Sequence, residues 1–146
     1  MSDLYDTDIV TWSERQAALL RRRAAGELVN EADIDWPNVA EEIESVGQSQ
    51  VDAVESLLFQ ALAHELKAQG WPLSRDAENW RADARGFRAQ ARRKFRESMR
   101  QKLDVAAIYA DALEALPEQM DGQPLLPPDR ECPVTLDQLL APPEGR

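Results

Sequence analysis

The feature that most constrains this chain is a long run of helical periodicity between Trp36 and Glu65. Apolar or small residues recur there at spacings of three and four, as one face of a helix requires. The run ends at Gly70 and Pro72, because glycine readily adopts positive φ and proline cannot continue the helical hydrogen-bond ladder. A glycine inside a helix costs about 1 kcal/mol relative to alanine. We therefore predict either one long helix or two nearly collinear helices that meet at Gly47.

Capping residues and helix breakers indicate further helices on both sides of this run. Serine, threonine and aspartate side chains accept hydrogen bonds from the free N–H groups of a first turn, whereas glycine and proline end helices. A further helix is predicted over roughly residues 98–116, ended by Pro117. The other expected boundaries are Asp6 or Thr7 to cap a first helix that stops at Gly26, Asp35 to cap the long helix, Ser74 to cap the next, and Thr135 with Gln138 as a capping box for a short last helix.

The two helices that follow the long run also have a predicted buried face, and no segment shows the alternation of a strand. The helix after Ser74 should bury Trp80, Ala84, Phe87, Ala91, Phe95 and Met99. The helix over residues 98–116 should bury Leu103, Ala106, Ala107, Ala110 and Leu113. We predict an all-α fold, an antiparallel helical bundle built on a long central helical hairpin. A proline-rich C-terminal tail from about Pro117 and a short last helix complete it.

Length and composition limit the classes of protein to which the chain can belong. At 146 residues we expect a single helical domain, residues 1–146, with the tail packed on the bundle. A net charge of -10 favours solubility and disfavours nucleic acid as the default partner. One cysteine excludes an intrachain disulfide, and one histidine excludes metal sites that need two. Without a leader or a membrane-length apolar run, we expect a cytoplasmic protein with no membrane, cofactor or metal.

Three glutamates at the start of the long helix, Glu41, Glu42 and Glu44, raise the question of a catalytic or metal-binding carboxylate set. On a helix, Ile43 and Gly47 share the face expected to be buried, which places the glutamates on the flanks and the outside. Their carboxylates therefore diverge, and the sequence has no Glu-x-x-His pair of the kind that di-metal bundles use. We interpret these glutamates as a solvated or salt-bridged acidic face.

The single histidine, His64, opens the sequence "HELKA", which resembles the start of a zinc-protease helix but lacks the second histidine. His64 and Glu65 lie near the predicted turn, as do Trp80 and Arg81. An enzyme with a small site there would use His64 as a general base and Arg81 to hold an anionic substrate. No nucleophile, metal or oxyanion site accompanies these residues, so the enzyme is an alternative hypothesis.

A cationic stripe lies along the helix after Ser74. Residues 75–102 hold ten bases against four acids, whereas residues 27–55 hold nine acids and no lysine or arginine. The stripe consists of Arg81, Arg85, Arg88, Arg92 and Arg96. Such a stripe is able to follow a phosphate backbone, with Arg85, Arg88 and Arg92 as the candidate binding residues.

Internal ion pairing is the preferred explanation of the stripe, because an antiparallel hairpin brings the acidic and basic segments together. Each exposed pair contributes only about 0.2–1 kcal/mol, so the pairs would select register more than they stabilise. The expected pairs are Glu55 with Arg88 or Arg92, Asp52 with Arg92 or Arg93, and Glu44 with Arg100.

Several blocks of the sequence resemble a known family. They are "YDTDIVTWSERQAALLR", "NVAEEIESVGQSQ", "LAHELKAQGWP", "SRDAENWRADAR" and "ECPVTLDQLL". In order and spacing they are similar to the bacterial family called domain of unknown function 29, over roughly residues 5–140, and "AEEIESVG" and "ECPVTLDQLL" are the most specific. The resemblance implies an all-helical soluble bacterial protein with no assigned activity and no functional residue to carry over. Val134 stands where such proteins often have an aromatic residue, which concerns the local packing of the tail.

The functional expectation combines the missing catalytic constellation with the long amphipathic helices. Such helices can offer a second apolar face to another molecule. We therefore predict a non-enzymatic protein–protein interaction module whose partner is another protein or a second copy in a homodimer. Nucleic-acid binding through the Arg81–Arg96 stripe and an enzyme with a small site around His64 are the alternatives.

Overall fold

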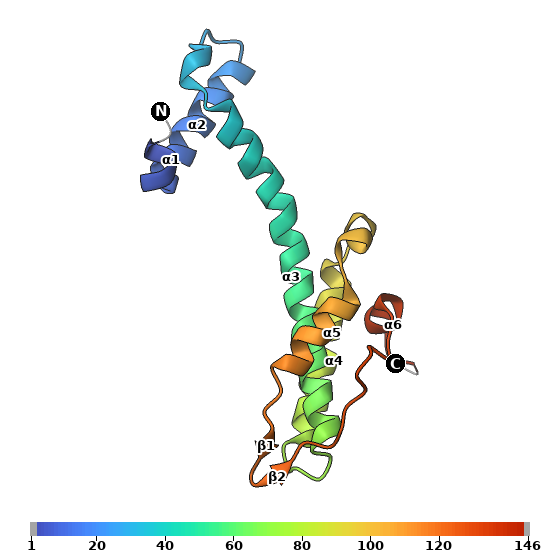
Figure 1. Cartoon of the computed structure of the whole chain (residues 1–146). Helices are drawn as coiled ribbons and strands as arrows, with labels where there is room; N and C mark the ends of the chain where they lie inside the picture. Colours follow the sequence, from blue (N-terminus) through green and yellow to red (C-terminus); the bar gives the residue numbers. More distant parts are fainter. Residues whose placement is uncertain (1–2, 145–146) are drawn as a thin grey trace. The chain divides into compact units, whose positions relative to one another are not determined.

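The computed structural model describes residues 3–144 and is predominantly helical (Figure 1). This confirms the predicted all-α class. The helices are α1 (Asp3–Thr7), α2 (Ile9–Ala24), α3 (Trp36–Gly70), α4 (Ala77–Lys94), α5 (Val105–Glu114) and α6 (Leu136–Leu140). The shorter elements are the 3₁₀ helices η1 (Glu31–Asp33) and η2 (Glu97–Lys102) and the strands β1 (Gln119–Met120) and β2 (Gln123–Pro124).

The chain divides into two compact units, and the division falls after Gln48, inside α3. The α3 helix is continuous through Gly47, so the first of the two predicted alternatives is correct. No neighbouring atom lies within 4 Å of the place that a Cβ at Gly47 would occupy. Packing therefore does not require glycine there. That residues 1–146 form one domain stays a prediction.

In the N-terminal unit, Asp8 caps α2 by accepting a hydrogen bond from the Thr11 N–H at 3.1 Å. The predicted caps Asp6 and Thr7 are wrong because both residues lie within α1. The end of α2 is as predicted, since Gly26 has a φ of +84°, a conformation that glycine adopts without steric cost.

The junction between α2 and α3 is organised around Trp12, which is buried. Its indole Nε1 donates to Asp35 Oδ2 at 3.1 Å, and the Asp35 N–H donates to Gln16 Oε1 at 2.9 Å. The ring of Tyr5 packs edge-on against Trp12, and the Tyr5 hydroxyl donates to Glu42 Oε1 at 2.5 Å. These polar contacts specify how α1 and α2 pack on the start of α3.

The predicted buried face at the start of α3 is wrong in part. Ile43 is 68% exposed, and Gly47 is also exposed. Buried positions of α3 begin only at Val51. The antiparallel partner α4 has 18 residues against 35 in α3, so it is too short to cover the whole helix.

The core of the C-terminal unit is formed by the second half of α3 together with α4, η2, α5 and α6. Val54, Leu58 and Leu139 are its largest fully buried side chains. The predicted stripe of α4 is confirmed at Ala84 and Ala91, which are buried where α4 approaches its neighbours. Small residues at these positions let the helix backbones lie close together.

The helix predicted over residues 98–116 is wrong in its start and in part of its buried face, since Leu103 is buried and Leu113 partly buried as predicted but the alanines are not. The chain leaves the helical conformation at Phe95 and again at Leu103, and Asp104 then caps a new helix, α5. Its buried face is Ile108, Tyr109 and Ala112, whereas Ala106, Ala107 and Ala110 are exposed. The large side chains remove more apolar surface from water than alanine methyl groups do, so they decide which face turns inward.

The tail from Pro117 contains an antiparallel hairpin with strands of two residues each, in which Met120 pairs with Gln123, and the helix α6. The sequence shows no strand alternation because strands of two residues are too short to have any. Asp121 and Gly122 form the turn with positive φ values of 51° and 76°. Further along, the predicted capping box of Thr135 and Gln138 is confirmed at the start of α6.

Candidate functional site

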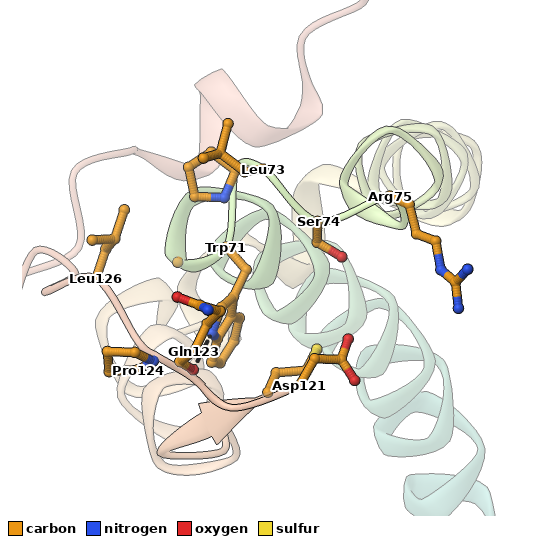
Figure 2. Close-up of a pocket in the computed structure, with 11 residues that line it drawn as sticks. Trp71, Leu73, Ser74, Arg75, Asp121, Gln123, Pro124 and Leu126 are labelled. Carbon is orange, nitrogen blue, oxygen red and sulfur yellow. Dashed lines mark hydrogen bonds between the residues drawn. The ribbon is translucent and has the colours of Figure 1, made fainter.

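A pocket of about 720 Å³ lies at the closed end of the α3–α4 hairpin. One wall is the turn that connects the two helices, residues 70–75, and the other is the hairpin of the tail, residues 120–126 (Figure 2). All of these residues belong to the C-terminal unit. The pocket is thus built from two segments about fifty residues apart in the sequence.

Two hydrogen bonds hold these walls together. The Leu126 N–H donates to the Gly70 carbonyl at 3.2 Å, and the indole Nε1 of Trp71 donates to the Gln123 carbonyl at 2.9 Å. Trp71 is only 5% exposed, so its ring forms the buried base of the pocket rather than a free platform. The two segments are therefore fixed to each other before any ligand binds.

Gly70 has a different role from the one predicted. Among the described glycines, positive φ values occur at Gly26 and Gly122, and Gly70 ends α3 without one. A Cβ at Gly70 would instead collide with the side chain of Leu125. Glycine leaves room for the Leu125 side chain where the tail passes over the end of the helix.

The rim of the pocket exposes large apolar side chains. Leu73 is 98% exposed and Leu126 is 51% exposed, and Pro72 and Pro124 lie beside them. Figure 2 shows the guanidinium group of Arg75 extending away from Trp71. The pocket therefore offers an apolar surface with few charges.

Ser74 lies near the end of the turn that forms this pocket, and the prediction that it caps α4 is wrong. Its hydroxyl oxygen accepts from the Asp76 N–H at 3.1 Å, and Asp76 occupies the cap position without a side-chain hydrogen bond. The helix α4 is therefore capped two residues later than predicted, at Asp76 instead of Ser74.

His64, the predicted general base, lies on the face of α3 that packs against α4. Its Nδ1 is 2.8 Å from the Gln60 carbonyl, and its ring packs against Phe87 at a centroid distance of 5.2 Å. The Nε2 atom is 3.9 Å from the Asp83 carboxylate, and the side chain is 19% exposed. The Nδ1 contact lies within α3, whereas the contact of the ring with Phe87 is part of the packing of α3 on α4.

The other two residues of the predicted enzyme site have separate partners. Glu65 pairs with Arg88, whereas Arg81 lies 3.3 Å from Glu78 on its own helix. The structure therefore assigns His64, Glu65 and Arg81 to three different interactions.

The half-buried pair of Arg88 and Glu65 is the central ionic contact of the hairpin. Arg88 Nη2 donates to Glu65 Oε2 at 2.9 Å, and Arg88 Nε lies 2.7 Å from Glu65 Oε1. That Nε is buried without a hydrogen bond of good geometry, so its contact is ionic rather than directional. The predicted partner of Arg88, Glu55, is wrong. Side chains lean toward the N-terminus of their own helix, so in an antiparallel pair Glu65 and Arg88 lean toward each other.

The remaining arginines of the stripe also have partners. Arg85 lies 3.6 Å from Glu78, Arg92 Nη1 donates to the Ala141 carbonyl at 3.2 Å, and Arg96 donates to backbone carbonyls. Arg100, predicted to pair with Glu44, instead contacts Glu97 and Asp137. Asp137 belongs to α6, whereas the predicted pairs considered only the two helices of the hairpin. The predicted pairing of Asp52 with Arg92 or Arg93 stays a prediction.

The three glutamates of "AEEIES" are not brought together. Glu41 and Glu44 are exposed, whereas Glu42 accepts the hydrogen bond of Tyr5. That hydrogen bond raises the pKa of Tyr5 to about 12, because the carboxylate favours the protonated phenol. Within residues 3–144, histidine, cysteine, aspartate and glutamate side chains form no group of three that could hold a metal ion.

Sequence reasoning missed the pocket of Trp71, Leu73 and Leu126. The available signal was the presence of leucines inside the turn-forming segments "GWPLS" and "QPLLPP", where solvent-exposed apolar side chains are unusual. Nothing local indicates that the two segments meet.

Comparison with known proteins places this helical architecture in a family. The model of the family described as domain of unknown function DUF29 matches residues 4–143. The chain belongs to this family. The resemblance of its sequence blocks to domain of unknown function 29 is thus confirmed.

The fold of this DUF29 protein is also found in a solved structure. The chain is similar to an alpha-helical protein of unknown function from Rhodospirillum rubrum, with a TM-score of 0.61 and 22% sequence identity. The match covers 93% of this chain and 88% of that chain. No curated protein gives a significant match. At such identity the similarity shows the fold alone.

Across residues 3–144, no helix of this DUF29 protein is both long enough and apolar enough to cross a membrane.

Proposed function

We propose that this DUF29 protein is a non-enzymatic protein–protein interaction module that docks a partner at the pocket between the α3–α4 turn and the tail hairpin. The observation that carries the proposal is Leu73, whose side chain is 98% exposed at the rim of a pocket of about 720 Å³. A single exposed leucine is ordinary on a protein surface. An exposed leucine beside a concave apolar surface is typical of a docking site.

The apolar rim indicates the chemistry of the partner. Leu73, Leu126 and two prolines would contact a leucine or an aromatic side chain presented by another protein. Covering a leucine side chain fully contributes roughly 1.5–3 kcal/mol, which corresponds to about 10-fold to 100-fold in affinity. Because hydrogen bonds already fix both walls, little ordering entropy opposes binding.

The two alternatives have less support. In the nucleic-acid hypothesis, Arg81, Arg85 and Arg88 would release carboxylates that now hold them before they could contact phosphates. In the enzyme hypothesis, His64 would need to leave its contacts with Gln60 and Phe87. As part of the proposal we place the protein in the bacterial cytoplasm, on its net charge of -10 and single cysteine.

A matched pair of leucine variants tests the docking site. Leu28 is 95% exposed in the N-terminal unit, so Leu28→Ser controls for the loss of an equally exposed leucine. A photo-crosslinker in place of Pro124 at the pocket rim should identify the partner in the native cell. Binding of that partner should weaken at least about tenfold for Leu73→Ser and stay unchanged for Leu28→Ser. Equal affinity of the two variants would contradict the proposal.

A further inference from the structure

A stretch of α3 in the N-terminal unit presents apolar side chains to solvent. Ile43 is 68% exposed, Val46 is 66% exposed and Trp36 is 47% exposed. Every residue from 43 to 48 is exposed, although the whole segment is helical. The backbone hydrogen bonds of a solvent-exposed helical segment contribute little to its stability, because most helical stability in proteins comes from packing of an apolar face.

The apolar side chains have the spacing of a helix-pairing seam. Trp36, Val39, Ile43 and Val46 follow one another at intervals of three, four and three residues. This is the spacing of the a and d positions through which two helices interlock. The stretch is therefore suited to a partner that is itself helical.

The charge of the stretch indicates that the partner is basic. Residues 27–55 contain nine acids and no lysine or arginine. Glu41 and Glu44, which flank the seam, are exposed. Pairing of two such stretches with each other would bring like charges together, which opposes association.

The same chain contains a basic helix end of complementary charge. Arg93 and Lys94 are exposed in the last turn of α4, and Arg96 follows them on the surface. Here we call residues 36–46 the acidic seam and residues 92–96 the basic end. Both surfaces occur once in each copy, which a symmetric dimer with two equal contacts requires.

We infer that this protein forms a homodimer in which the acidic seam of each copy binds the basic end of α4 in the other. The interface is separate from the pocket at the α3–α4 turn. Its existence does not depend on the proposed docking function. Because the contact joins opposite charges, salt should weaken the dimer.

Sedimentation velocity of the full chain over a concentration series tests the inference. The wild-type protein should dimerise at low salt, and its dissociation constant should rise with added NaCl. The double variant Glu41→Lys/Glu44→Lys should dissociate at least about tenfold more readily, because two attractive contacts become repulsive in each half of the interface. The control Glu114→Lys/Glu118→Lys changes charge equally at exposed positions outside the seam and should dimerise like the wild type.

A mixing experiment distinguishes this interface from a general effect of charge. On its own, Arg93→Glu/Lys94→Glu should also dissociate at least about tenfold more readily than the wild type. Mixed with Glu41→Lys/Glu44→Lys, it should form a heterodimer. In one contact the native acidic seam meets the native basic end, and in the other the lysines of the altered seam meet the glutamates of the altered end. Circular dichroism verifies that each variant is folded.

Two results would overturn the inference: a wild-type chain that stays monomeric at every concentration and salt, or reversed variants that fail to associate on mixing. A monomeric wild type that still binds a partner through Leu73 would refute the dimer alone and leave the proposed function in place.

Discussion

Replacing Leu139 with alanine tests whether the short C-terminal helix is part of the core of its unit. Leu139 is completely buried although it belongs to α6, which has only five residues. An isolated helix of that length is not stable in water. The packing of Leu136 and Leu139, together with the capping box, must therefore hold α6 in place.

The expected cost follows from the burial of the side chain. Leucine to alanine removes three carbon groups, each contributing about 0.8 kcal/mol when buried, and leaves a cavity that adds to the loss. We expect the free energy of unfolding to fall by about 3 kcal/mol, within the range of roughly 2–5 kcal/mol for buried leucines. For a chain of this size, that corresponds to a melting temperature lower by roughly 6–12 °C.

Urea denaturation followed by far-UV circular dichroism measures this change. The control is Leu73→Ala, which removes the same atoms from a side chain that is 98% exposed and should change stability by less than about 0.5 kcal/mol. If Leu139→Ala is as stable as that control, the reasoning is refuted. A selective increase in protease cleavage of the tail at unchanged stability would refute it as well.

Two further predictions concern polar contacts. In a Tyr109→Phe background, ultraviolet titration should show Tyr5 ionising near pH 12, and the further change Glu42→Gln should return the pKa of Tyr5 toward 10. Because folding raises this pKa, the contribution of the Tyr5–Glu42 hydrogen bond to stability is complete below pH 10 and is lost as the pH rises through 12. Ionisation of Tyr5 near pH 10 in the Tyr109→Phe protein would contradict this. A double-mutant cycle with Arg88→Met and Glu65→Gln should give a coupling energy of about 1–2 kcal/mol. The two side chains are 28% and 23% exposed, so this ion pair is intermediate between an exposed pair and a fully buried one. Strictly additive effects of the two substitutions would argue against the pair.

The elements that could be predicted depend on interactions close in sequence. The length of α3 follows from its periodicity, the end of α2 from the conformational freedom of Gly26, and the start of α6 from Thr135 and Gln138. Each involves residues within a few positions of one another. These local contacts form in much the same way whatever the rest of the chain does.

The candidate site was not predictable in the same way. The hydrogen bond from Trp71 to the Gln123 carbonyl joins residues 52 positions apart, and neither residue indicates the other. Gly70 was singled out for the right position and the wrong reason, because the space beside it is occupied by the Leu125 side chain and its φ is not positive. A pocket made by two irregular segments has no periodicity from which to infer it.

The sequence by itself determined the helical class, the family, the extent of α3, the end of α2 and the start of α6. Only the tertiary structure decided that Ile108 and Tyr109 rather than the neighbouring alanines face the core, that Arg88 pairs with Glu65, and that Ile43 stays exposed. Periodicity identifies surfaces able to be buried, but several surfaces compete for each neighbour. Which of them is covered depends on the lengths and side-chain volumes of helices far away in the chain, since burial is a property of the packed unit.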